Sequence, residues 1–272
     1  VLVLAVTTLS AFLRLDHVGL GCADWPACYG QEPHALDAPK PFTVIAARLF
    51  HRFAAVAALV TVLVLMLVSY GNRPFLRGPG VTSILLLLLS VFLTVLGIWT
   101  TPGAPPAVTL GNLLGGFAMV GLFWWTRLAC SEHASGIPSP PAPGRLAARL
   151  ALVVLIVQIA LGGLTSATLS SLSCTTLPDC HGVWWAAEWT ASSFDPLRAP
   201  DAASATAPGN PGAPIHMAHR LLAVALVALL GAAAWPAVRS AARTSAVAAL
   251  VLAGAQIGLG AAMVAGSLPI AL

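Results

Sequence analysis

Seven apolar segments dominate this 272-residue chain. They cover residues 1–13, 42–70, 81–100, 108–129, 147–169, 215–238 and 246–268. All but the first have the length of a membrane-spanning helix, which needs roughly 20 apolar residues. The apolar runs are continuous instead of alternating, and the chain has only two Tyr, which argues against a barrel with an aromatic girdle. The sequence therefore predicts an all-α integral membrane protein with the lipid bilayer as its surroundings.

The scarcity of charge excludes other classes of protein. Charged residues make up 8% of the chain, against about a quarter in a soluble domain. So few charges cannot cover a globule with polar groups, which excludes a soluble enzyme, and a hydrophobic content of 58% excludes a disordered chain. The net charge of +4 is spread thinly without a basic stripe, so nucleic acid is not an expected partner.

The distribution of charges between the loops predicts the topology. The loops after the second, fourth and sixth segments are rich in Arg and hold one acid, Glu132, whereas the long loops after the first and fifth segments hold eight of the nine acids. The positive-inside rule places the Arg-rich loops in the cytoplasm and the long loops outside. Because the chain opens inside an apolar run and closes soon after another, we expect it to be a fragment of a longer one.

Four of the five cysteines lie in the two long outer loops. They form two pairs of spacing C-x5-C, Cys22 with Cys28 and Cys174 with Cys180. Disulfides persist on the oxidising side of a membrane, so both pairs are candidate disulfides. Each is either a static staple or a redox-active bond that exchanges with a thiol carrier. The Ala-, Pro- and Ser-rich residues 186–214 predict a mobile excursion.

The two halves of the chain repeat each other. Residues 21–30 match residues 173–182 at both Cys, at Pro and at the final Gly. Four segments per repeat keep both halves in one orientation, which predicts two pseudo-symmetric four-helix bundles in a parallel repeat. The eighth helix of this scheme is missing from the seven given segments. The expected domains are an N-terminal half (1–130), a cytoplasmic linker (131–146) and a C-terminal half (147–272).

A His-Arg pair follows each repeated loop, near the outer end of the next segment. The pairs are His51-Arg52 and His219-Arg220. Ionisable groups inside membrane spans are costly and usually functional, and imidazole is a common ligand of haem iron. A histidine that only bonds a neighbouring helix is the alternative. The duplication favours the iron ligand.

Other residues near these pairs are candidates for holding the same group. A guanidinium pairs with a carboxylate in a fork geometry, so Arg52 and Arg220, with Arg14 from the first segment, are candidates for binding haem propionates. Interfacial snorkelling is the alternative. His216 precedes His219 by three residues and lies on nearly the same helix face. It is a candidate for orienting a ligand residue, for contacting a neighbouring helix or for binding the iron itself. The remaining histidines are expected to be solvated in loops: His17, His34, His133 and His181.

The sequence resembles the haem A synthase family along its whole length. Arg14-Leu15-Asp16 and residues 19–30 are similar to that family's first outer loop, close to R-L-T-x-S-G-L-G-C-P-D-W-P-x-C-x-G. Counterparts also exist for Gln158 with Leu161-Gly162-Gly163, for Cys174 with Cys180, and for both His-Arg pairs. The resemblance implies eight helices in two halves, with haem b between two His in the C-terminal half. It also implies oxidation of the C8 methyl of haem O to the formyl of haem A in the N-terminal half.

The same resemblance implies a place in the cell and partners. We expect a multi-pass protein of the bacterial inner membrane with the cysteine loops on the periplasmic face. Haem O synthase or a respiratory oxidase complex would be the partner.

Two positions depart from the family pattern. Arg48 stands where the family has a Glu, three residues before the first His-Arg pair. Gly111 stands where the fourth helix of the family carries a second His, and Asn112 is the nearest polar side chain, although an amide is a poor haem ligand. Three functions are therefore weighed: a haem A synthase with a haem b relay, a non-catalytic haem b electron-transfer or assembly subunit of a respiratory complex, and a periplasm-facing thiol-disulfide oxidase. A transporter would explain the repeat but not the His-Arg pairs.

Overall fold

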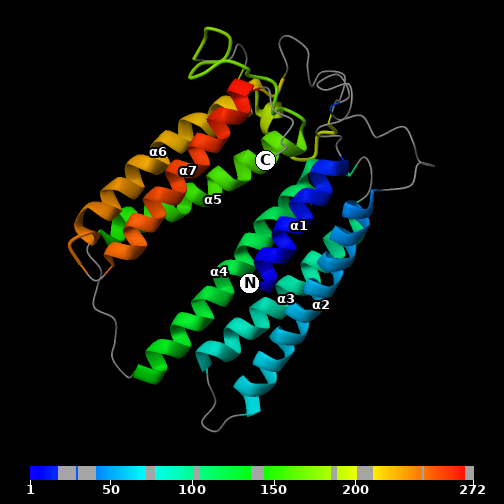
Figure 1. Cartoon of the computed structure of the whole chain (residues 1–272), viewed down its shortest axis with the longest axis vertical. Helices are drawn as coiled ribbons and strands as arrows, with labels where there is room; N and C mark the ends of the chain where they lie inside the picture. Colours follow the sequence, from blue (N-terminus) through cyan, green and yellow to red (C-terminus); the bar gives the residue numbers. More distant parts are fainter. Residues whose placement is uncertain are drawn as a thin grey trace. The chain divides into compact units, whose positions relative to one another are not determined.

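The computed structural model shows an all-helical chain (Figure 1). It describes residues 1–17, 29, 41–71, 77–100, 104–135, 144–184, 189–200, 211–240 and 242–266. The helices in these ranges are α1 (Leu2–His17), α2 (Phe42–Gly71), α3 (Arg77–Trp99), α4 (Pro106–Ser135), α5 (Arg145–Ala167), the short 3₁₀ helix η1 (Ala191–Phe194), α6 (Ala213–Ala237) and α7 (Arg243–Gly266). None of the described residues forms a β-strand. The seven predicted segments are confirmed as α-helices.

Six of these helices, α2 to α7, are long and apolar enough to cross a membrane. Their large apolar side chains point outward, and in α7 no described residue is buried. Exposing this much apolar surface to water is unfavourable, whereas the hydrocarbon core of a bilayer is itself apolar. The chain is an all-α integral membrane protein.

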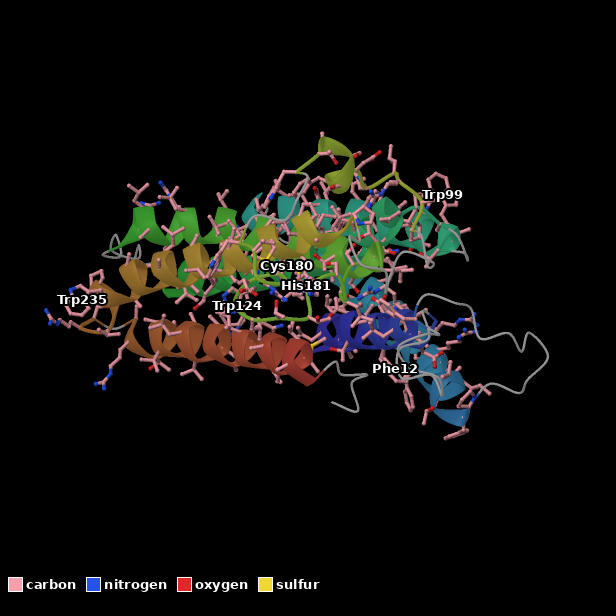
Figure 2. The ribbon with its side chains drawn as sticks, turned by 90° about the horizontal axis from the view of Figure 1, so that it is seen from above. Phe12, Trp99, Trp124, Cys180, His181 and Trp235 are labelled. Carbon is pink, nitrogen blue, oxygen red and sulfur yellow. A yellow bond between two sulfur atoms is a disulfide. The ribbon has the colours of Figure 1, made fainter. Side chains whose placement is uncertain are left out.

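Tryptophans mark the Arg-rich ends of two spans. Trp124 of α4 and Trp235 of α6 are both more than half exposed, and Figure 2 shows the Trp235 side chain pointing away from its helix. The Arg127 guanidinium lies 4.9 Å from the ring centre of Trp124, and that of Arg239 lies 5.5 Å from the ring centre of Trp235. Amphipathic Trp and Arg side chains of this kind are typical of a membrane–water interface.

The chain divides into two compact units. Unit 1 comprises Val1–Val18, Glu32–Ala104 and Gly111–Ser139, and unit 2 comprises Gly19–Gln31, Pro105–Leu110 and Pro140–Leu272. Helix α4 continues beyond the expected linker boundary at residue 130 and ends at Ser135, while its first turn belongs to unit 2.

Unit 1 is built around a small apolar core. Val62 of α2, Leu86 of α3 and Met119 of α4 are buried together. A buried hydroxyl pair adds a polar link, because Thr126 Oγ1 of α4 donates a hydrogen bond to Thr82 Oγ1 of α3 at 3.0 Å. Small and hydroxyl side chains at such positions let transmembrane helices approach closely.

Unit 2 centres on the antiparallel helices α5 and α6 and on the loop between them. Pro214 lies in the first turn of α6, where its missing N–H has no helical partner to lose. Part of the loop for which the sequence predicts mobility forms contacts: η1 follows Trp189, its Ser193 is buried, and the Ala107 N–H donates to the Pro196 carbonyl at 2.8 Å. Helix α4 therefore begins against this loop.

Candidate functional site

His219 of α6 lies against α5 in unit 2. The Gln158 Nε2 of α5 is 3.4 Å from the His219 Nε2. A Cβ placed on Gly162, one turn further along α5, would lie 2.7 Å from the His219 Cε1. The imidazole thus packs against the backbone of α5 at a position where any side chain larger than that of glycine would collide with it. The side-chain amide of Gln158, also on α5, lies beside the ring.

Two polar atoms at this place have no partner. The His219 Nδ1 and the Gln158 Oε1 are buried and form no hydrogen bond with any described residue. Leaving a buried polar atom unpaired costs about 1–3 kcal/mol, and the Gln158–His219 contact is long for a hydrogen bond. An unsatisfied buried group in a native structure calls for an explanation, and an absent water or ion is one. The His219 Nδ1 is the ring nitrogen that no described residue occupies.

A bare metal ion does not fit the described residues. No three His, Cys, Asp or Glu side chains converge among them. A single imidazole with a neighbouring amide suits an iron whose other ligands come from a macrocycle such as haem. The residues present in unit 2 are therefore compatible with haem.

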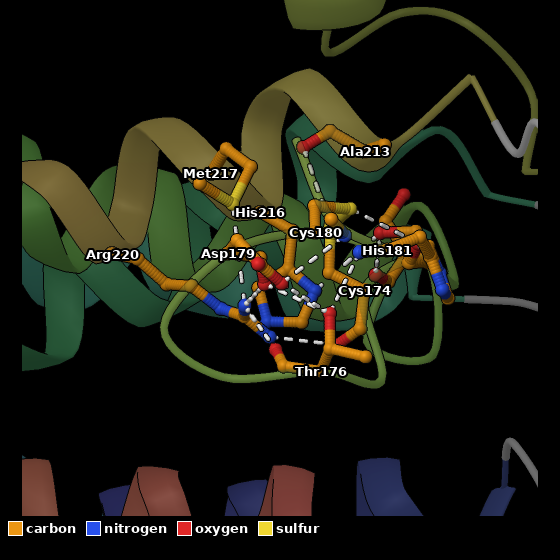
Figure 3. The surroundings of a disulfide bond; sticks show 12 residues. Cys174, Thr176, Asp179, Cys180, His181, Ala213, His216, Met217 and Arg220 are labelled. Atoms are coloured by element: carbon orange, nitrogen blue, oxygen red, sulfur yellow. Dashed lines mark hydrogen bonds between the residues drawn. A yellow bond between two sulfur atoms is a disulfide. The ribbon is translucent and has the colours of Figure 1, made fainter. Parts of the chain in front are cut away.

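A disulfide loop follows α5 and contacts the first turns of α6 (Figure 3). Cys174 and Cys180 form a disulfide, as their spacing predicted, with both residues buried. Within the disulfide ring, Thr176 Oγ1 donates to Asp179 Oδ1 at 2.8 Å, and it accepts a hydrogen bond from the N–H of His181, the residue after the ring. The predicted pair of Cys22 and Cys28 lies outside the described residues.

Arg220 reaches this loop instead of pointing away from it. Its Nη1 donates to the carbonyl oxygens of Thr176 and Asp179 at 2.7 and 2.8 Å, and its Nη2 donates to that of Cys174 at 2.6 Å. Three of the five guanidinium N–H groups are therefore already bonded to the loop. Binding of a haem propionate by Arg220 remains a prediction.

His216 also turns toward the loop. It is 7% exposed, and its Nδ1 lies 3.4 Å from Ser173 Oγ. The neighbouring Met217 is fully buried against the disulfide. His181, expected to be solvated, is exposed but its Nε2 lies 3.2 Å from the Ser173 carbonyl oxygen.

The candidates of unit 1 lie on α1, α2 and α4. His51 is half-buried in α2, its neighbours Arg48 and Arg52 are exposed, and Arg14 is half-buried in α1. Asn112 is occupied, since its Nδ2 donates to Thr100 Oγ1 at 3.0 Å.

The side of α4 that bears Gly111 is closed by α3. A Cβ on Gly111 would lie 2.7 Å from Leu96 Cδ1, and one on Gly115 would lie 2.6 Å from Leu93 Cδ2. Leu96 thus fills the space into which a side chain at position 111 would enter. No larger residue fits there unless Leu96 moves.

Sequence reasoning left several of these residues without a role. Gln158 and Gly162 had been matched to a family motif only, and their four-residue spacing, which puts them on one helix face, was the available signal. Thr176 and Asp179 contribute backbone carbonyls, for which side-chain identity carries no signal.

Comparison with known proteins confirms the family that the sequence resembles. A family model described as cytochrome oxidase assembly protein, COX15-CtaA, matches residues 1–272. A Heme A synthase of Shewanella oneidensis is 30% identical over 252 residues, which cover 85% of this chain and 74% of that protein. With a family match over its full length and this relative beside it, the chain belongs to the COX15-CtaA family of cytochrome oxidase assembly proteins.

Proposed function

We propose that the protein acts as a haem A synthase, oxidising the C8 methyl of haem O to the formyl of haem A, with a haem b relay at His219. The observation that carries this proposal is the half-buried imidazole of His219, with an unpaired Nδ1, against Gly162 and Gln158. The name of the Shewanella oneidensis relative supports the same activity.

The residues of unit 2 would hold haem b as follows. His219 would bind the iron through a ring nitrogen, while Gln158 would orient the ring from its second side, as partners of metal-bound histidines commonly do. Haem b supplies one-electron chemistry when bound. Gly162 keeps α5 out of the way of the imidazole. In unit 1, His51 would face the substrate haem.

We further propose the bacterial inner membrane as the location, with the Cys174–Cys180 loop on the periplasmic face. The concentration of Arg in the loops on the opposite side, after α2, α4 and α6, supports this orientation. Haem O synthase, which makes the substrate, and a respiratory oxidase complex, which uses the product, are the proposed partners.

A non-catalytic haem b protein is the second candidate. The filled space beside Gly111 and the exposed cation at Arg48 favour it, because unit 1 then offers fewer groups for a substrate haem. In that case the protein would pass electrons or assist assembly without making haem A.

The thiol-disulfide oxidase is less well supported. Thiol exchange needs an accessible sulfur, whereas Cys174 is 1% exposed and Cys180 is 3% exposed. Their burial supports a static staple.

Co-expression with haem O synthase tests these candidates. The full-length protein is purified from membranes, and its haems are identified by pyridine haemochrome spectra and chromatography. Haem A as product supports the synthase, haem b alone supports the carrier, and no haem at all contradicts both. His219→Ala should lose haem b, whereas Val224→Ala, an exposed position on the same helix, should retain it.

A further inference from the structure

Arg220 holds the disulfide loop by backbone contacts at three separated points. The three accepting carbonyls belong to Cys174, Thr176 and Asp179, so the guanidinium spans the ring from one cysteine to the residue before the other. Charge-assisted hydrogen bonds are roughly twice as strong as neutral ones. A snorkelling arginine would reach for water or headgroups, and this one is turned into the protein.

The loop is also held by bonds that do not involve Arg220. The disulfide closes it, and Asp179 Oδ1 accepts hydrogen bonds from Thr176 Oγ1 and from the Gly182 N–H at 3.3 Å. The guanidinium reaches the three carbonyls from two nitrogens, Nη1 and Nη2. A lysine ammonium has three donors, but all three are on one nitrogen, so it matches this span less well.

The contacts with the loop fix the rotation of α6. At about 100° per residue, His216, Arg220 and Met217 fall within an arc of about 100°, and all three contact the loop. His219 lies outside this arc by about 60° and faces Gln158 and Gly162 of α5. A rotation of α6 about its axis would therefore break the contacts with the loop and, at the same time, move the imidazole of His219.

We propose that Arg220 is a positioning residue, which locks the Cys174–Cys180 loop onto α6 and thereby sets the direction in which His219 points. The second half of this inference rests on the proposed function, in which His219 is an iron ligand. The first half, the lock on the loop, does not depend on it.

The first test measures the lock without haem. In the full-length protein in nanodiscs, the rate at which a phosphine reduces Cys174–Cys180 is followed by differential alkylation and mass spectrometry of that peptide. Arg220→Gln should speed reduction by about tenfold, since charged hydrogen bonds are lost, with Arg220→Lys between it and the parent. Arg243→Gln, at an exposed arginine of α7, should match the parent. An unchanged rate in Arg220→Gln overturns the proposal; if that variant does not accumulate, an unchanged rate in Arg220→Lys does so.

The second test measures the effect on His219. The electron paramagnetic resonance g-values of the bound haem should shift in Arg220→Lys at unchanged haem content, because the ring plane turns. Unchanged g-values together with a faster reduction would overturn the link to His219. A parent protein without haem would overturn the proposed function, while the reduction rates would still decide the lock on the loop.

Discussion

The imidazole of His219 on α6 packs directly against the backbone of α5 at Gly162. A Cβ at position 162 would come within 2.7 Å of the His219 Cε1, closer than carbon atoms approach without a shift. The nearest atoms belong to a ring and not to the flexible end of a chain, so relief requires the imidazole or the helix to move.

Gly162→Ala should therefore displace His219. Alanine normally stabilises a helix relative to glycine by about 1 kcal/mol, so a loss of stability would report the clash. We expect haem affinity to fall by about tenfold, the effect of weakening the ligand contact by about 1.4 kcal/mol. Absorbance at the Soret band and thermal unfolding would measure both. Gly258→Ala is the control because nothing lies near its added Cβ, and equal behaviour of the two variants would contradict the close approach.

Gln158→Leu should separate stability from binding. Gln158→Leu relieves the buried, unpaired Oε1 but also removes the Nε2 beside His219 Nε2, so the two effects, each about 1 kcal/mol, should nearly cancel in the stability of the protein without haem. Haem affinity should fall in the same variant, because the side chain that orients His219 is gone. Unfolding of the haem-free protein and haem titration test the two effects. Gln256→Leu on the exposed surface of α7 is the matched control, and a Gln158→Leu variant that binds haem as the parent does would refute the role of the amide.

The positions of the helices could be predicted from the sequence alone, whereas the side-chain contacts at the candidate site could not. The spans follow from continuous apolar runs, which lipid requires whatever the neighbours are. The outcome for Arg220 was not predictable, because its partners are backbone carbonyls that every residue possesses. The unpaired Nδ1 of His219 likewise depends on how α5 and α6 meet. The hydrogen bond between Ala107 and Pro196 was not predictable from composition, because it joins backbone groups far apart in the sequence.

The Cys174–Cys180 bond should act as a staple. Cys174→Ser with Cys180→Ser is expected to lower the free energy of unfolding by about 2 kcal/mol, the loop-closure effect for so short a ring. Haem binding, if it needs the loop contacts to α6, should weaken with it. Chemical denaturation in mixed micelles measures the stability, and Cys130→Ser, which removes the exposed free thiol, serves as the control. Unchanged stability in the double variant would contradict the role of the disulfide as a staple.

Because Leu96 fills the space beside Gly111, unit 1 can be tested by adding a side chain at position 111. Gly111→His alone should destabilise the protein, since the new side chain meets Leu96 Cδ1, and overpacking of this kind costs about 1–3 kcal/mol. Adding Leu96→Ala should recover most of that loss, because it empties the same volume. A non-additive double-mutant cycle in thermal unfolding would confirm that the two positions compete for one space. If the double variant also binds more haem than Leu96→Ala alone, measured by Soret absorbance, the space filled by Leu96 is what limits haem binding in unit 1. Additive effects on stability without recovery would mean that Leu96 does not close the site.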